Sequence, residues 1–403
     1  MKHITKIIAI AMVLMFAVAA FAACAQAPAP AAPTAVPEPI GEGKPVDPGQ
    51  AVESTQAAKG EFGTEKLDKE YYIGKIPITL SHAVHGNDAK WADLYAKEKY
   101  GAKYEVIDPA QDLQKEIAAV ETFISKGVDG IILHPVTEAG VNEVIKEARD
   151  AGVYVVTYFI LPTEAKVPHL QALEGGVAGE MGKDMAKQWM ELYPDKPVKV
   201  GFIDFLSITY CMDHRSGPFL TAVKGVTSLD GTVKGIFNTA GEELLGATYW
   251  LAGEGDLTKA QAAAQDGLTK YPEVNVIYAT NTPNVLGAIS AYEAVGRGLA
   301  VNGVPQTEIF AGTDGDAPEL VKLADPTSSL KYTLGMQPQT FAYAQVDLIM
   351  DTILGKVKPD EYSLRIVEDK YFNYYKDSVD TLEKWFNTQY FGNLDIEAEL
   401  AKK

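Results

Sequence analysis

Polar and aromatic side chains that suit ligand binding follow a series of short apolar segments along this chain. In the first half of the chain they are His85, Asn87, Trp91, His134 and Phe159. In the second half they are Tyr210, Arg215, Asn281, Asp314 and Gln337. Carboxylates and amides match hydroxyl groups, which both donate and accept hydrogen bonds, and aromatic faces match the apolar C–H patches of a sugar ring. These ten residues are the candidate ligand-binding set, and their types favour an uncharged polar ligand.

Each candidate also has a structural interpretation that the sequence alone leaves open. Asn and Asp at the end of a strand are often helix caps or turn formers. Trp91 lies in a helical segment and could belong to the core, and Arg215 could pair with a surface carboxylate. The placement of such residues at equivalent strand ends in two halves of the chain favours the binding interpretation.

Metal and phosphate sites have less support. His82, His85 and Asp88 precede a helix, so helical spacing does not bring them onto one face as metal ligands. The glycine-rich run 176–183 ends in a lysine, but Asp184 follows where a phosphate-binding loop needs Ser or Thr. We therefore expect no metal and no cofactor.

Catalysis is also poorly supported. The sequence contains no Gly-x-Ser-x-Gly motif. Asp314 and Asp316 could serve glycoside hydrolysis, but the sequence gives no separation for their carboxyl groups. Cys211 is expected to be a buried apolar side chain, because a neighbouring His214 is weak evidence for a nucleophile. We expect no catalytic residues, and a hydrolase remains the enzyme alternative.

The elements that position the candidate residues alternate between strand and helix. Short apolar runs indicate strands that are buried on both faces, and the amphipathic segments between them indicate helices. The expected strands span 76–80, 104–107, 128–133, 153–157, 198–203, 233–237, 274–279, 309–312 and 330–334. Because the same order occurs in both halves, the sequence predicts an α/β protein with two similar Rossmann-like lobes, each containing a parallel sheet.

Composition excludes several classes of protein. Hydrophobic residues make up 47% and charged residues 22% of the chain, which is ordinary for a globular protein. The 36 Lys and Arg residues against 54 Asp and Glu give a net charge of −18, so we expect no nucleic-acid partner. Two cysteines cannot form a disulfide framework or a four-thiolate zinc site.

The first residues are typical of an export signal. Lys2 and Lys6 precede an apolar run that ends in small residues, so residues 1–23 are expected to be a signal peptide. Small residues directly before Cys24 resemble a bacterial lipobox, which implies a lipid on that cysteine. The alternative is an uncleaved membrane anchor. Residues 24–73 are expected to comprise the lipidated cysteine and a Pro/Ala-rich linker.

Several segments of the body resemble a known family. They are residues 127–136, 148–157, 215–219, 281–296 and 312–315. Their order and spacing are similar to those of the type I periplasmic sugar-binding proteins of ABC importers, the ribose-binding group. The resemblance implies two lobes joined by a hinge of three segments.

The resemblance also implies discontinuous domains. The N-terminal α/β lobe would comprise residues 74–172 plus 338–358, the C-terminal α/β lobe residues 173–337, and residues 359–403 would form a C-terminal tail that packs on the body.

Ligand contacts are implied by the same resemblance. Arg215, Asn281 and Asp314 match family residues that hydrogen-bond sugar hydroxyls and the ring oxygen. The first-loop contacts of the family fall near His85, Asn87 and Trp91.

The chain departs from the family pattern at two places. Phe159 and Ile160 stand where the family often has Asp-Arg, which removes a usual sugar anchor. The glutamine expected near the last crossing falls on Met336 or Gln337.

Together these implications describe a monomeric, exported lipoprotein in the periplasm or at the cell surface, held to a bacterial membrane through Cys24. It would bind a small polar ligand, a monosaccharide, in the cleft between the lobes and deliver it to an ABC permease in the membrane. The alternatives are a receptor for a nucleoside, a furanose signal or an amino acid, and a sensory binding protein.

Overall fold

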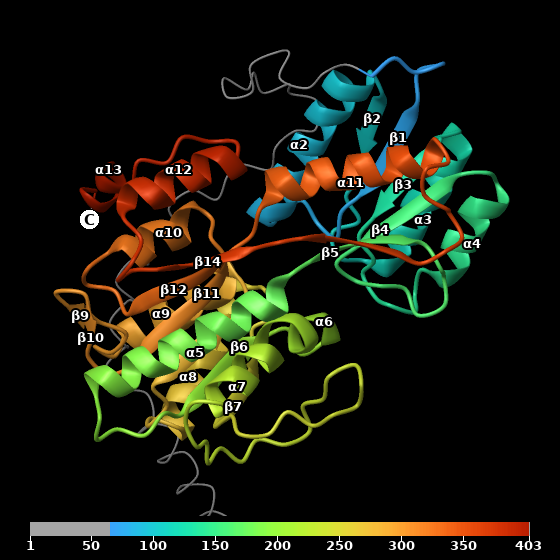
Figure 1. Ribbon diagram of the computed structural model, residues 1–403. Coiled ribbons are helices and arrows are strands. Elements are labelled where there is room, and N and C mark those ends of the chain that lie inside the picture. Colours follow the sequence, from blue (N-terminus) through green and yellow to red (C-terminus); the bar gives the residue numbers. More distant parts are fainter. Residues whose placement is uncertain (1–64, 403) are drawn as a thin grey trace, which may run out of the picture. The chain divides into compact units, whose positions relative to one another are not determined.

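A computed structural model describes residues 65–402, which form an α/β protein with two lobes, each built on a six-stranded sheet (Figure 1). Five strand pairs in the first sheet and four in the second are parallel, which confirms the predicted fold class. The expected signal peptide, Cys24 and residues 25–64 of the linker lie outside the described residues. No helix within the described part of the chain is long and apolar enough to cross a membrane.

The first lobe contains the sheet with strand order β13-β5-β4-β3-β1-β2, whose neighbours are all parallel. Its strands are β1 (Tyr72–Ile76), β2 (Lys103–Val106), β3 (Gly130–Leu133), β4 (Tyr154–Tyr158), β5 (Pro168–Ala172) and β13 (Ser363–Val367). Its helices are α2 (Ala83–Tyr100), α3 (Leu113–Lys126), α4 (Asn142–Asp150) and α11 (Pro338–Ile353). Helices α2 and α11 pack together over one face of the sheet, and α3 and α4 pack together over the other.

The second lobe contains the sheet with strand order β14-β12-β11-β8-β6-β7, in which only the edge strand β14 is antiparallel. Its strands are β6 (Val200–Asp204), β7 (Tyr249–Ala252), β8 (Val276–Ala279), β11 (Ile309–Asp314), β12 (Leu330–Gly335) and β14 (Lys370–Asn373), beside a small hairpin of β9 (Ala300–Val301) and β10 (Val304–Pro305). Its helices are α5 (Glu174–Leu192), α6 (Thr209–Cys211), a π-helix (Met212–Ser216), α7 (Gly217–Lys224), α8 (Leu257–Lys270), α9 (Thr282–Glu293), α10 (Ala317–Ala324), α12 (Val379–Gln389) and α13 (Ile396–Leu400).

Local sequence signals set where several helices begin and end. The carboxylate of Asp112 accepts hydrogen bonds from the first N–H groups of α3, and Gly127 ends that helix in the left-handed region at φ +67°. The side chains of Asp256 and Asn281 cap α8 and α9 in the same way. Each capped helix starts just after a strand, so its first turn lies at the carboxyl edge of a sheet.

The chain passes between the two sheets three times. The crossings lie between β5 and α5, between β12 and α11, and between β13 and β14. Only Glu368 and Asp369 separate the last two strands. Residues after 359 therefore do more than pack on the body, because they add an edge strand to each sheet.

Four expectations from the sequence differ from the structure. Helix α2 begins at Ala83, so His85 and Asp88 lie within it rather than before it. The first strand spans Tyr72–Ile76 rather than 76–80, because Pro77 has no N–H to continue the ladder, and it begins inside the segment 24–73 assigned to the linker. The strand expected over 233–237 does not form, since Gly235 turns the backbone to φ +80°. Its place beside β6 is taken by β7. Strands β5, β13 and β14 had no expected counterpart.

A buried ion pair ties two helices of the first lobe to its sheet. Lys75 on β1 donates hydrogen bonds to the carboxylate of Asp88 on α2 and to the side-chain oxygen of Gln345 on α11. Gln345 Nε2 in turn donates to Asp88 Oδ1 at 3.1 Å. All three residues are at most 2% exposed, so each polar group depends on the other two for its partners.

We expect Asp88→Ala to lower the free energy of unfolding by about 3–5 kcal/mol, because it leaves the buried Lys75 ammonium without its counter-ion. The measurement is urea denaturation followed by circular dichroism. Asp93→Ala is the control, since Asp93 on the same helix forms only an exposed pair with Lys97 and its loss should change stability little. Equal effects of the two substitutions would contradict the assignment.

Candidate functional site

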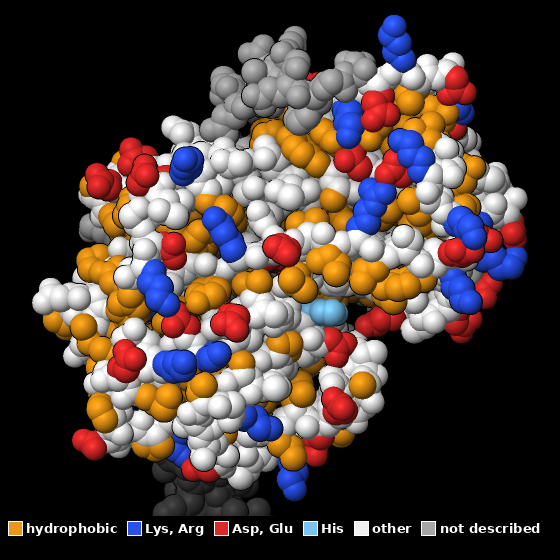
Figure 2. Space-filling view, viewed as in Figure 1, with side chains coloured by type: hydrophobic (Ala, Val, Ile, Leu, Met, Phe, Trp, Pro, Cys, Tyr) orange, Lys and Arg blue, Asp and Glu red, His pale blue; other side chains and the backbone are white. Residues whose placement is uncertain are grey.

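A cavity of about 70 Å³ lies between the two lobes, where the carboxyl ends of their strands meet. Figure 2 shows the hollow between the lobes, with a histidine side chain visible at its edge. The cavity is several times the ~10–15 Å³ that one water molecule requires, so a small molecule fits. Seven of the ten candidate residues line it: His85, His134, Phe159, Tyr210, Arg215, Asn281 and Asp314.

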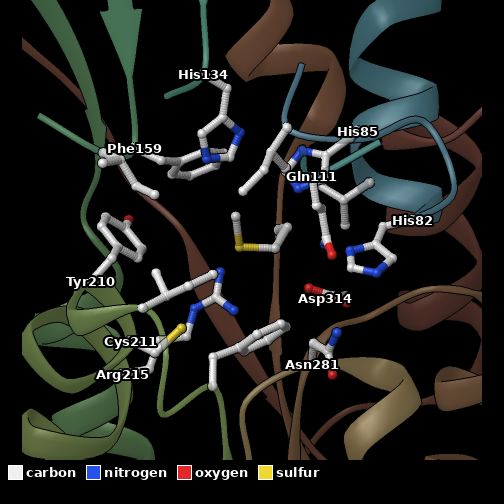
Figure 3. Close-up of a pocket in the computed structure, with 16 residues that line it drawn as sticks. His82, His85, Gln111, His134, Phe159, Tyr210, Cys211, Arg215, Asn281 and Asp314 are labelled. Atoms are coloured by element: carbon white, nitrogen blue, oxygen red, sulfur yellow. The ribbon is translucent and has the colours of Figure 1, made fainter. Parts of the chain in front are cut away.

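The lining residues come from the ends of many strands, as the position of the cavity requires. His134 follows β3 and Phe159 follows β4 in the first lobe, while Asn281 follows β8 and Asp314 ends β11 in the second. Figure 3 shows His82, His85 and His134 on one side of the cavity and Arg215, Asn281 and Asp314 on the other. The two lobes therefore present different chemistry to a common space.

Arg215 is fixed by a buried carboxylate and a backbone carbonyl. Its Nε donates to Glu174 Oε2 at 2.6 Å, its Nη2 to Glu174 Oε1 at 3.3 Å, and its Nη1 to the carbonyl oxygen of Thr280 at 2.6 Å. Burial opposes the positive charge, but Glu174, Cys211 and Asp314 together outweigh burial and raise the pKa of the guanidinium. Arg215 lies on the π-helix, a wide turn that is frequent at functional sites.

The side chain of Asn281 caps a helix through its oxygen, while its amide nitrogen has no hydrogen-bond partner. Its side-chain oxygen accepts a hydrogen bond from the N–H of Asn284 at 2.9 Å and so caps α9. Its Nδ2 group is buried and has no hydrogen-bond partner. Because buried donors are usually satisfied, this amide is a free contact for a ligand in the cavity.

Asp314 has a strained backbone and an unusual carboxyl group. Its φ is +105°, a conformation that costs a non-glycine residue of the order of 1–3 kcal/mol. Hydrogen bonds to its carbonyl oxygen from Tyr390 Oη at 2.9 Å and from the N–H of Met336 at 3.0 Å hold it there. Burial raises the pKa of its side chain to about 7, although Arg215 opposes the shift.

The wall from the first lobe is built from aromatic rings that carry no charge. The ring centroids of His85 and His134 are 5.1 Å apart, and Phe159 lies 5.2 Å from His134 and stacks on Phe341 at 4.6 Å. Burial lowers the pKa of both histidines well below the usual value, so they are neutral near pH 7. Their Nδ1 atoms are buried and have no partner, which leaves each free to bond a ligand.

Two hydrogen bonds join the lobes at the rim of the cavity. Gln171 Nε2 on β5 donates to Tyr210 Oη at 2.8 Å. Thr209 Oγ1 in the second lobe donates to Glu138 Oε1 in the first at 2.6 Å. Tyr210 therefore faces the cavity with its ring while its hydroxyl group links the lobes.

Three candidate residues do not line this cavity. Asn87 Oδ1 accepts a hydrogen bond from the N–H of Phe391 at 2.7 Å, and Trp91 is 1% exposed. Trp91 stacks on Phe391 at 4.0 Å and donates from Nε1 to the carbonyl oxygen of Gln389 at 2.8 Å. Both residues thus anchor the C-terminal segment to α2. They do not reach the cavity, because they lie on the face of α2 that this segment covers.

Gln337, the third, borders a neighbouring cavity of about 10 Å³ and donates its side-chain amide to the carbonyl oxygen of Glu368. This contact joins two of the three crossings between the lobes. Met336, one residue earlier, lines the main cavity instead.

Several lining residues were not among the ten candidates. They are Ile78, His82, Val84, Gln111, Ile160, Phe205, Ile208, Cys211 and Met336. Apart from His82 and Gln111 these residues are apolar, and nothing in the sequence distinguishes the apolar ones from core residues. Glu174 was also missed, because it follows β5, a strand that the sequence analysis did not identify.

The described residues do not favour three other chemistries considered from the sequence, namely a metal site, a phosphate-binding loop and a thiol nucleophile. Within 65–402, no three His, Cys, Asp or Glu side chains are placed to hold a metal ion. The glycine-rich run 176–183 lies inside helix α5 rather than in a loop. Cys211 is 4% exposed, and burial raises the pKa of its thiol well above the usual value, which disfavours a nucleophile.

Comparison with protein families gives a match over most of the body. The family described as the periplasmic binding protein domain matches residues 73–356.

Curated relatives are similar over comparable lengths. The ribose import binding protein RbsB of Bacillus subtilis strain 168 is 24% identical over 306 residues, which are 76% of this chain and 88% of the relative. The galactofuranose-binding protein YtfQ of Escherichia coli K12 is 23% identical over 281 residues, 66% of this chain and 80% of the relative.

Solved structures share the fold. The crystal structure of a galactofuranose binding protein superposes with a TM-score of 0.63 at 18% identity, covering 79% of this chain and 100% of that chain. That of GanP, a glucose-galactose binding protein from Geobacillus stearothermophilus, gives a TM-score of 0.61 at 21% identity, covering 76% of this chain and 99% of that one.

We expect Asp314→Asn to stabilise the unliganded protein at pH 8 and to have little effect at pH 4. The folded-state pKa of about 7 lies above the ordinary 3.8, so the unfolded chain ionises first and stability falls as pH rises between these values. The loss approaches at most about 4 kcal/mol above pH 7. Asparagine removes this penalty and keeps an oxygen for the N–H of Thr282.

The measurement is the thermal unfolding midpoint of both proteins across this pH range. Asp266→Asn, at an exposed carboxylate of the same lobe, is the control. A stabilisation by Asp314→Asn that is the same at pH 4 and pH 8 would rule out the raised pKa as its cause.

Proposed function

Because this chain belongs to the periplasmic binding protein family, we propose that it captures a monosaccharide between its two lobes and delivers it to an ABC permease. The observation that carries this proposal is the set of unpartnered polar atoms that face one cavity from both lobes: Nδ1 of His85, Nδ1 of His134 and Nδ2 of Asn281. Buried polar atoms without partners are rare in folded proteins, and a ligand with several hydroxyl groups would satisfy all three.

The mixture of surfaces in the cavity suits a sugar ring. Phe159 and Phe205 supply apolar faces, while Asn281, Asp314 and Arg215 supply donors and acceptors for hydroxyl groups. The relatives named above for ribose, galactofuranose and glucose-galactose binding support the same ligand class. We therefore propose that the ligand is a neutral pentose or hexose, and that the protein takes part in its transport and does not catalyse a reaction on it.

A ligand held in this way would favour closure of the lobes. Contacts to both walls can form at once only when the lobes are close, so binding shifts the population toward the closed state. The hydrogen bonds from Gln171 to Tyr210 and from Thr209 to Glu138 would add to the stability of that state. A permease could then distinguish loaded from empty protein by the relative position of the lobes.

The test is isothermal titration calorimetry with D-ribose, D-allose and D-galactose. At least one should bind, and Asn281→Ser should weaken its affinity about tenfold or more, because serine keeps the helix cap but loses the Nδ2 donor. Asp256→Ser makes a similar cap change at α8, outside the cavity, and should leave affinity unchanged. Absence of binding by all three sugars would overturn the proposal.

We further propose that the protein is exported and held to the membrane by a lipid on Cys24, with the Pro-rich segment as tether. In bacterial cells expressing the full chain, labelled palmitate should be incorporated into the wild type, and Cys24→Ala should abolish the label and release the body from the membrane fraction. Labelling of the alanine variant, or its retention with membranes, would contradict this site of attachment.

A further inference from the structure

We propose that Glu174 sets the charge selectivity of the cavity: by neutralising Arg215 it makes the site accept uncharged ligands and reject anionic ones. The inference rests on the proposed function and deepens it, since it separates neutral sugars from sugar acids and from ligands with a free carboxylate. Glu174 acts through Arg215 and does not line the cavity, so it is a positioning residue.

The first step is the geometry of the pair. Glu174 is the first residue of α5 and is fully buried, and both of its carboxylate oxygens accept hydrogen bonds from the guanidinium of Arg215. Bidentate pairs of this kind fix the plane of the guanidinium and are among the strongest charge-assisted hydrogen bonds. The positive charge that an anionic ligand would seek is therefore already matched within the protein.

The second step concerns the donors that remain. A guanidinium has five N–H groups, and three hydrogen bonds are made to Glu174 and Thr280. Two N–H groups are left, and Figure 3 shows the guanidinium directed into the cavity. Arg215 can thus donate hydrogen bonds to ligand hydroxyl groups although its charge is balanced.

The third step is the charge of the other walls. Asp314 adds an acidic group near Arg215. Burial lowers the pKa of the three lining histidines, His82, His85 and His134, and so disfavours their charged forms. Lys75, behind the histidines, is paired with Asp88. The lining therefore carries no uncompensated positive charge, and an anion would lose its hydration without gaining a counter-ion.

The experiment compares ligands of the same size that differ in charge. The sugar that binds in the calorimetric panel is tested beside its terminal carboxylate and the corresponding primary amide, which are D-galacturonate and D-galacturonamide if that sugar is D-galactose. For the wild type at pH 7.5 we expect the amide to bind at least tenfold more tightly than the acid. Glu174→Gln should reduce this ratio at least tenfold, because it exposes the charge of Arg215 to the ligand.

Glu180→Gln is the matched control, since Glu180 lies exposed on the same helix and its loss should leave the ratio unchanged. Should Glu174→Gln fail to fold, the double variant E174Q/R215Q replaces the ion pair by two amides and should keep the wild-type preference for the amide.

A wild type that binds acid and amide equally, a Glu174→Gln protein with the wild-type ratio, or a double variant without the preference would overturn the inference. In each of these cases the neutral sugar still binds the wild type, so the proposed function survives. If no sugar of the panel binds, the proposed function fails and the inference fails with it.

Discussion

Parallel strands direct all their carboxyl ends to one edge of a sheet, and both sheets of this protein turn that edge toward the same gap. This constraint places side chains that are far apart in sequence within one small cavity. His134 and Asp314, for example, are separated by 180 positions in the sequence, yet both line this cavity. The three crossings of the chain maintain this arrangement, because each returns the backbone to the other lobe near the cavity.

The two lobes line the cavity with different kinds of polar groups. The second lobe supplies ionisable groups in fixed positions. The guanidinium of Arg215 is bound to Glu174, and Asp314 has a strained backbone conformation. The first lobe supplies neutral imidazoles beside phenyl rings. Such a division lets one wall orient hydroxyl groups while the other covers the apolar parts of a ligand, and neither wall needs a free charge.

The alternation of apolar strands and amphipathic helices predicted the two-lobed α/β fold. The polar residues at strand ends, together with the family resemblance, predicted seven residues that line the cavity. Prediction from the sequence failed where a residue's role depends on contacts with segments that are distant in the chain. Asn87 and Trp91 lie close in sequence to His85, but the turn of the helix carries them to a face covered by the C-terminal segment. Strands β13 and β14 were missed because an edge strand with exposed Leu364 and Ile366 lacks the continuous apolar run of a central strand. The importance of Glu174 depends on a contact with Arg215, which no spacing reveals.

The short connection between β13 and β14 has a consequence for how the protein is made. A ribosome releases the N-terminus first, and most of the first lobe emerges more than 150 residues before the strand that completes its sheet. Both lobes receive their final edge strands within the same eleven residues, from Ser363 to Asn373. Until that stretch has emerged, β5 and β12 each present an unpaired edge, which is the condition under which nascent chains recruit chaperones or aggregate. The lobes thus mature almost simultaneously, whatever the order in which their first strands are synthesised.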